Sequence, residues 1–201
     1  DLGAAGWAWE DVLPYFKRLE SDLDCHGPLH GRDGPIPIRR ILPDGWPAFG
    51  EAIAHALDAT GLPRRLDQKG EFEDGIFPPA FSNRDDRRVS TAVAYLDDAT
   101  RARPNLEIMT ECTVTDVVVN GRRAEMVVIR RRDGSRRSLR ARRVILTAGA
   151  LQSPAILMRS GIGPAEHLRS VGIEVVVDRP GVGRNLRDHP ALTFSQVLPR
   201  H

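Results

Sequence analysis

The residues best placed for chemistry follow a short apolar segment in the second half of the chain. Residues 143–147 have Val-Ile-Leu at their centre and are predicted to form a buried parallel strand. The chain continues through Ala148–Ala150, and Ser153 with the proline after it is predicted to open a helix that Gly161 closes. Backbone N–H groups and the helix dipole at such a helix start favour negative charge. Gly149 lacks a Cβ, which lets a cofactor approach the backbone closely.

The elements before this turn favour a nucleotide-binding arrangement. Residues 113–119 and 124–131 are predicted strands, joined at Asn120 and its following glycine, which form a strong hairpin turn. Residues 138–140 are expected to pair back after a second turn, which gives a three-stranded meander. A meander, a strand, a glycine turn and a helix in this order suit a nucleotide-binding domain. Taken alone, residues 147–150 fit an ordinary strand-to-helix turn equally well, with glycine present for steric reasons.

The first half of the chain is predicted to combine short helices with loops. Apolar residues at helical spacing predict a helix over residues 9–19, which Pro14 is expected to divide or restart. Residues 25–38 are rich in glycine and proline and are predicted to be a loop. His30 lies in this loop and is expected to be exposed to solvent, with a place at a substrate entrance as the alternative. Further predicted elements are helices at 48–60 and 90–102 and strands at 106–109 and 173–177.

The composition argues against several classes of function. The chain has 201 residues, 41% hydrophobic and 28% charged, which suits one globular domain or two small ones. Its net charge of +2 is too small to imply binding to nucleic acid or to an acidic membrane, and the arginines of residues 122–143 lack interleaved aromatic residues. Cys25 and Cys112 match no metal or disulfide spacing, so free thiols and no metal are expected. No apolar run approaches the roughly 20 residues of a membrane span, and a cytoplasmic location is expected.

The order of several motifs is more specific than any one of them. The segment Gly149–Gly163 resembles, position for position, the second signature of the glucose–methanol–choline (GMC) oxidoreductase family. Downstream, residues 163–168 and Pro180–Pro190 look like the continuation of the family's chain. Upstream, Gly6–Phe16 and residues 88–96 also fall in family order. The resemblance covers essentially the whole sequence.

This resemblance implies an FAD flavoprotein with an FAD domain and a separate substrate domain. Members of the family oxidise small-molecule alcohols by passing hydride from the alcohol carbon to flavin N5, while a histidine takes the hydroxyl proton. The resemblance also implies that the main chain of Val114 bonds the adenine edge of FAD, and that Thr147, Ala148 and Gly149 lie near its adenosine or pyrophosphate. A core valine and a plain turn are the alternatives for these residues.

Asp188 and His189 fall where the family's chain approaches the flavin and the junction of the domains. A structural or cofactor-proximal role is expected for both, rather than that of proton acceptor. The Gly-x-Gly-x-x-Gly that reaches the FAD pyrophosphate does not occur in this sequence, and the family's catalytic histidine falls beyond His201. The chain is therefore predicted to be an internal piece of an enzyme, without a catalytic residue of its own. Alone, it is expected to bind FAD weakly, to turn over no substrate and to be marginally stable.

The predicted fold class is mixed α/β: an incomplete FAD/NAD(P)-binding Rossmann-like domain with a β-meander, plus part of a GMC substrate domain. Residues 1–82 are expected to supply flavin-interface helices and a substrate-side segment, residues 83–189 the distal half of the FAD-binding domain, and residues 190–201 the start of the substrate domain. A non-catalytic binding module derived from a flavoprotein is the alternative. An NAD- or nucleic-acid-binding domain is disfavoured by the absent glycine triplet and the mild charge. The residues identify neither the alcohol nor the electron acceptor.

Overall fold

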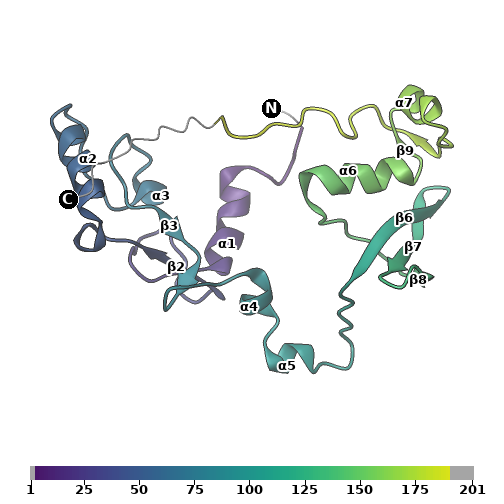
Figure 1. Ribbon diagram of the computed structural model, residues 1–201, viewed down its shortest axis with the longest axis horizontal. Helices are drawn as coiled ribbons and strands as arrows, with labels where there is room; N and C mark the ends of the chain where they lie inside the picture. The colour runs from purple at the N-terminus through teal and green to yellow at the C-terminus, as the bar shows by residue number, and fades with distance from the viewer. Residues whose placement is uncertain (1–2, 191–201) are drawn as a thin grey trace. The chain divides into compact units, whose positions relative to one another are not determined.

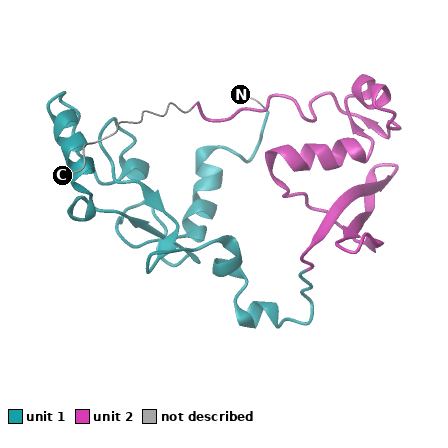
Figure 2. Cartoon of the chain, in the orientation of Figure 1, with its two compact units in different colours: residues 1–108 teal, residues 109–201 magenta. Residues whose placement is uncertain are grey.

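The computed structural model describes residues 3–190 of the chain (Figure 1). The chain divides into two compact units, residues 1–108 and 109–201, which Figure 2 colours teal and magenta. Both units mix helices with short strands, as the predicted α/β class requires. The predicted start of a substrate domain at 190–201 lies, except for its first residue, outside the described residues. Within residues 3–190 no helix has the length and apolar character needed to cross a bilayer.

Unit 1 is built around a small sheet with the order β1-β2-β3. β1 (Glu20–Asp22) runs parallel to β2 (Ile36–Arg40), and β3 (Ala80–Phe81) pairs with β2 in the antiparallel sense. α1 (Trp9–Leu19) leads directly into β1. The remaining elements of unit 1 are η1 (Pro43–Gly45), α2 (Ala48–Asp58), α3 (Gln68–Glu71), β4 (Asn83–Arg84), β5 (Arg87–Arg88), α4 (Thr91–Tyr95) and α5 (Asp98–Arg101).

Two helices of unit 1 differ from their predictions. α1 is one continuous helix with Pro14 inside it, because a proline removes only one backbone hydrogen bond and later turns keep theirs. The single helix predicted over residues 90–102 is instead α4 and α5. The carboxylate of Asp97 accepts a hydrogen bond from the Thr100 N–H at 2.7 Å, and this local bond starts a new helix where the first one ends.

Unit 2 contains the predicted three-stranded meander. β6 (Cys112–Asn120) pairs with β7 (Arg123–Arg131), which pairs with β8 (Arg136–Arg140), all in antiparallel sense. The first hairpin turn contains Gly121, whose φ of +58° is in the left-handed region. α6 (Gly149–Arg159) runs beside β6 (Figure 1). The other elements of unit 2 are β9 (Ile162–Gly163), α7 (Ala165–Ser170) and β10 (Val177–Asp178), with β10 parallel to β9.

Three of the predicted strands, and the start of α6, are wrong. Residues 143–147 form no strand, and the Ile145 side chain is 83% exposed. A strand needs a neighbour for its backbone hydrogen bonds, and no described residue pairs with this segment. Residues 106–109 are also not a strand, and of 173–177 only the last residue belongs to one. α6 begins four residues earlier than predicted, at Gly149.

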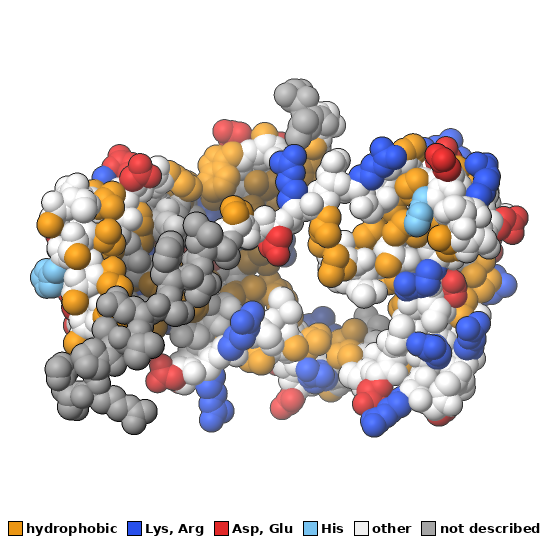
Figure 3. All heavy atoms as spheres, turned by 45° about the horizontal axis from the view of Figure 1, so that its top comes forward, with side chains coloured by type: hydrophobic (Ala, Val, Ile, Leu, Met, Phe, Trp, Pro, Cys, Tyr) orange, Lys and Arg blue, Asp and Glu red, His pale blue; other side chains and the backbone are white. Residues whose placement is uncertain are grey.

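The two units bury different kinds of side chain. The buried side chains of unit 2 are apolar, namely Val117, Ile129, Ile156 and Leu168. In unit 1, two of the strands and the loop between them bury three charged or polar residues, Asp22, His30 and Arg40. Hydrophobic side chains also show at many places on the surface in Figure 3. The polar interior of unit 1 and the open start of α6 in unit 2 are the two features that could bind a ligand or take part in chemistry.

Candidate functional site

The segment predicted to meet a phosphate is an exposed turn that leads into α6. Gly149 has a φ of +83°, in the left-handed region that favours glycine, and the position of a Cβ there faces open space. The Ala148 N–H donates to the Ser153 Oγ at 3.0 Å, so a side chain from within the helix closes the turn. The next N–H groups have no partner inside the helix, because the first turn of any α-helix lacks acceptors. Thr147, Ala148 and Gly149 therefore form an open helix start that suits an anionic group.

A groove in unit 2 runs from this helix start along α6. Its walls are one side of the helix and the loop after β10, with Ala150, Leu151, Pro154, Met158 and residues 183–187 lining it. The loop approaches the helix closely at Gly183, where a Cβ would lie 3.4 Å from the Met158 Cε. The groove thus joins the predicted phosphate turn to the loop that carries Arg184 and Arg187, whose positive charges also suit an anionic ligand.

Asp188 and His189 follow this loop directly but do not line the groove. Both residues are exposed, and the Asp188 Oδ1 accepts a hydrogen bond from the His189 backbone N–H at 2.8 Å. This short-range bond shapes the local backbone. Their assignment to the flavin side of a cofactor site stays a prediction.

Val114 lies near the start of β6, opposite Ile129 of β7, and is half-buried. Its carbonyl accepts a hydrogen bond from the Arg159 Nη2 at 3.4 Å, and the carbonyl of Thr115 accepts one from the Arg159 Nε at 3.0 Å. Arg159 is the last residue of α6, so its side chain joins the end of this helix to the start of β6, which lies far away in the sequence. The structure brings Val114 to the same helix that begins at Gly149. Sequence reasoning gave no role to Arg159.

Unit 1 contains a cluster of five charged side chains that sequence reasoning missed. Arg40 donates from Nη1 to both carboxylate oxygens of Asp22, at 2.8 and 2.9 Å, and both side chains are 1% exposed. His30 Nδ1 lies 2.9 Å from Glu20 Oε1, and His30 Nε2 lies 2.7 Å from Asp67 Oδ2. We call these residues the ion cluster. It ties β1, β2, the loop between them and the N-cap of α3 together.

The prediction that His30 is exposed is wrong, because its side chain is 4% exposed. Burial alone would lower the pKa of His30, but hydrogen bonds to Glu20 and Asp67 outweigh burial and hold the pKa above its ordinary value. Both ring nitrogens face carboxylates, which only accept when ionised, so this arrangement favours the protonated ring, which donates on both sides. Similarly, burial would raise the pKa of Asp22, yet the hydrogen bond from Arg40 keeps it below its usual range.

The ion cluster has the spacing of a metal site but the bonding of an ion-pair network. Ligand atoms of Glu20, Asp22 and His30 lie within 4.8 Å of one another. A metal would need a neutral imidazole and a free carboxylate. Arg40 already bonds both oxygens of Asp22, and His30 donates from both nitrogens. Nearby, burial raises the pKa of the Cys25 thiol to about 11, which makes it an unreactive core residue.

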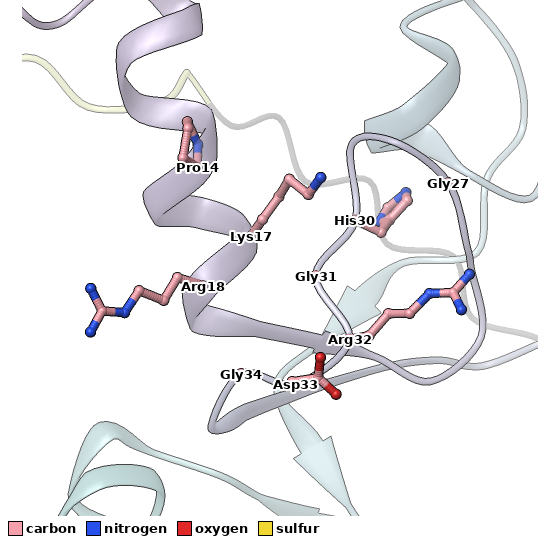
Figure 4. Close-up of a pocket in the computed structure, with 9 residues that line it drawn as sticks. All are labelled: Pro14, Lys17, Arg18, Gly27, His30, Gly31, Arg32, Asp33 and Gly34. Carbon is pink, nitrogen blue, oxygen red and sulfur yellow. The ribbon is translucent and has the colours of Figure 1, made fainter.

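A pocket lies beside the ion cluster, between α1 and the loop after β1 (Figure 4). Lys17 extends from α1 toward the loop that carries His30, whereas Arg18 points away. The glycines of the loop permit a close approach to the helix. A Cβ at residue 31 would lie 1.9 Å from the Lys17 carbonyl oxygen, and one at residue 34 would lie 2.3 Å from the Leu19 carbonyl carbon. The pocket thus results from the close packing of the loop on α1, and its histidine, His30, is already bonded to Glu20 and Asp67.

Raising the pH should destabilise unit 1, because His30 must then lose its proton. A histidine whose folded-state pKa lies above its unfolded value stabilises the fold fully below the unfolded pKa, about 6.5, and loses that contribution as the pH rises through the folded pKa. The three tryptophans, residues 7, 9 and 46, all lie in unit 1 and report its unfolding. The urea midpoint of their fluorescence should fall as the pH is raised above about 6.5.

His30→Gln should remove this fall, whereas the control His55→Gln, at a side chain 73% exposed, should keep it. Asp22 affects stability only at acidic pH. Because its pKa is lowered in the folded state, the stability that it contributes is lost as the pH falls through that folded-state pKa. A wild-type midpoint that stays constant from neutral to alkaline pH would contradict the charged state of His30.

The chain is similar to several known proteins. A model of the family described as GMC oxidoreductase matches residues 1–191. A 5-(hydroxymethyl)furfural oxidase from Methylovorus sp. (strain MP688) is 51% identical over 193 residues, which are 95% of this chain and 36% of that protein. The crystal structure of a pyridoxine 4-oxidase from Mesorbium loti matches with a TM-score of 0.79 and 36% identity, over 87% of this chain and 34% of that one.

A third match is a structure of Aspergillus oryzae RIB40 formate oxidase, determined to study FAD modification. It has a TM-score of 0.75 and 27% identity, and it covers 88% of this chain and 31% of the other. The chain spans about a third of the length of each of these proteins.

Proposed function

The chain belongs to the GMC oxidoreductase family, and we propose that it forms part of an FAD-dependent enzyme that oxidises a small alcohol. Its relatives include proteins named as oxidases, and one of the similar structures was determined to study modification of FAD. Because the chain spans about a third of their length, the proposal concerns the whole protein that carries it. A cytoplasmic location stays a prediction.

The observation that carries this proposal is the open start of α6. The residues there fit a dinucleotide: free N–H groups of the first turn suit a phosphate, and Gly149 leaves room for it. We propose that Thr147, Ala148 and Gly149 hold the adenosine or pyrophosphate part of FAD, and that the main chain of Val114 bonds the adenine edge. When bound, the flavin accepts the hydride that leaves the alcohol carbon.

We further propose that the base that takes the alcohol proton lies outside this chain. Carboxylates engage both ring nitrogens of His30 and hold its pKa above the ordinary value, so neither nitrogen is free to accept a proton from a substrate. Asp188 and His189 are proposed to lie near the flavin without acting as the base. In the same scheme, residues 83–189 belong to the FAD-binding domain, residues 1–82 supply flavin-interface helices and a substrate-side segment, and residues 190–201 begin the substrate domain.

The proposal is tested on the purified protein that carries this chain. Its visible absorption spectrum should show bound flavin, directly or after incubation with FAD. Anaerobic addition of a panel of small alcohols should bleach that absorption with at least one member, because hydride transfer reduces the flavin. A protein that takes up no FAD would support the alternative, a non-catalytic binding module. Bound flavin that no alcohol reduces would contradict the proposed reaction.

Substitution of Gly149 should weaken FAD binding specifically. An alanine there must adopt a φ near +83°, which costs on the order of 1–2 kcal/mol. The helix start is expected to shift to relieve this strain, and FAD should bind about tenfold more weakly. Gly172→Ala is the matched control, because Gly172 has a φ of +73°, also faces open space and also lies next to a helix end in unit 2. Titration of the apoprotein measures both, and equal losses in the two variants would contradict the proposal.

The isolated chain of 201 residues is expected to bind FAD weakly, because it lacks the Gly-x-Gly-x-x-Gly turn that reaches the pyrophosphate. Titration of the chain with FAD should give a dissociation constant well above about 1 µM. Tight binding below that value would show that the glycine turn is dispensable.

A further inference from the structure

β6 is an edge strand of the meander, and the last turn of α6 is fastened to its free edge. The sheet has the order β6-β7-β8, so one side of β6 has no strand beside it among the described residues. On that side the Val117 N–H donates to the Ser160 Oγ at 2.8 Å, and the hydroxyl donates in turn to the Ile156 carbonyl at 2.7 Å. Ser160 thus acts as a relay between the strand edge and the helix.

The second fastening point is a β-bulge. The register of β6 and β7 shifts between Val114, which faces Ile129, and Asp116, which faces Val128, so Thr115 has no partner residue in the ladder. A bulge turns backbone groups away from the ladder and re-aims them. The carbonyl of Thr115 then accepts from the Arg159 Nε at 3.0 Å, and the carbonyl of Val114 accepts from the Nη2 at 3.4 Å.

One guanidinium therefore holds two successive carbonyls at the start of β6. A carbonyl oxygen has two lone pairs, so the Val114 carbonyl can accept a second hydrogen bond beside the one from Arg159. The planar, forked donors of arginine fix the orientation of such an acceptor, which a flexible lysine amine does not do. Adenine presents an amino donor at its exocyclic N6, beside ring acceptors. A carbonyl acceptor that is fixed in this way suits an amino donor such as the exocyclic N6 of adenine.

From these contacts we infer that Arg159 is a positioning residue, which orients the Val114 carbonyl to accept a hydrogen bond from the adenine amino group of FAD. The inference rests on the proposed function, since it names the part of the cofactor that this end of β6 recognises. It predicts discrimination between adenine and a base without the amino group. Ser160 holds the same helix to the same strand but bonds Val117, three residues away, so it is expected to stabilise the unit without affecting this discrimination.

The experiment compares FAD with its deaminated analogue, which carries hypoxanthine in place of adenine. The apoprotein of the whole protein that carries this chain is titrated with each flavin. The wild type should prefer FAD by about tenfold, the size of effect that one hydrogen bond to a base edge gives. Arg159→Met should reduce the preference to about twofold or less, with most of the change in the affinity for FAD. Arg159→Lys should give an intermediate ratio, and it serves as the test if Arg159→Met does not fold.

Ser160→Ala is the matched control, and it should keep the wild-type ratio even if both flavins bind more weakly. A merely structural role of Arg159 would lower both affinities together and leave the ratio unchanged in the arginine variants, which would overturn the inference. A wild type that binds FAD without preferring it over the analogue would also overturn it. A wild type that binds neither flavin would instead contradict the proposed function itself.

Discussion

Arg40→Met is expected to cost unit 1 about 3–5 kcal/mol, because it leaves the buried Asp22 carboxylate without its counter-charge. The two side chains are each 1% exposed, and Arg40 supplies two short hydrogen bonds to that carboxylate. Methionine fills a similar volume, so the loss reports the missing charge rather than a cavity. Tryptophan fluorescence of the 201-residue chain in a urea series measures the change.

The control is the neighbouring residue of the same strand. Arg39 is 51% exposed in its side chain and pairs at 3.3 Å with Asp24, whose side chain is 7% exposed but keeps the hydrogen bond from the Arg40 backbone N–H, so Arg39→Met should cost clearly less than Arg40→Met. Arg40→Met should lower the urea midpoint strongly or, where the loss exceeds the stability of the chain, abolish the cooperative transition. Equal midpoints for the two variants would show that the ion cluster is not what holds the strands and α3 together.

Gly31→Ala is expected to cost about 3 kcal/mol or more, because no space exists for a methyl group at this position. The new Cβ would lie 1.9 Å from the Lys17 carbonyl oxygen and 2.5 Å from the Glu20 carbonyl oxygen. Both are backbone atoms, so α1 and the loop must separate before the side chain fits. The same movement would pull His30, the preceding residue in the chain, away from its carboxylate partners. The urea midpoint of Gly31→Ala should therefore fall, and the dependence of that midpoint on pH should be lost.

Gly27→Ala is the matched control for this substitution. Gly27 lies in the same loop, but a Cβ there would meet only the His30 ring, at 3.9 Å, which is an ordinary contact. This variant should unfold close to the wild type. A Gly31→Ala protein with wild-type stability would show that the loop does not pack against the end of α1 as the structure has it.

The elements that sequence patterns predicted well are those whose structure depends on local signals. The meander follows from strand-forming segments separated by short turns, and Gly121 adopts the left-handed conformation that the first hairpin turn needs. The Gly149–Gly163 segment was found because glycine, proline and apolar residues occur there at the spacing of a known family signature. The confirmed family and fold class rest on such signals, since each turn is specified by a few neighbouring residues.

The failures share a different cause, which is dependence on residues far away in the chain. Residues 143–147 have the composition of a buried strand, but a strand is completed by a neighbour, and the described residues supply none. His30 was expected in solvent because its loop is rich in glycine and proline. Its burial depends on Asp67, 37 residues later, and on the close packing that Gly31 permits. Asp22 and Arg40 carry no sequence signal of their pairing, since only the parallel strands bring them together.

The central claim is that the start of α6 contacts the FAD of the proposed enzyme, and hydrogen–deuterium exchange tests it most directly. The protein that carries the chain is compared with and without FAD, with α7 as an internal reference outside the proposed contact. FAD should slow the exchange of amides at residues 148–151 and at residues 112–116, and leave α7 unchanged. Bound flavin with unaltered exchange at residues 148–151 would contradict the account.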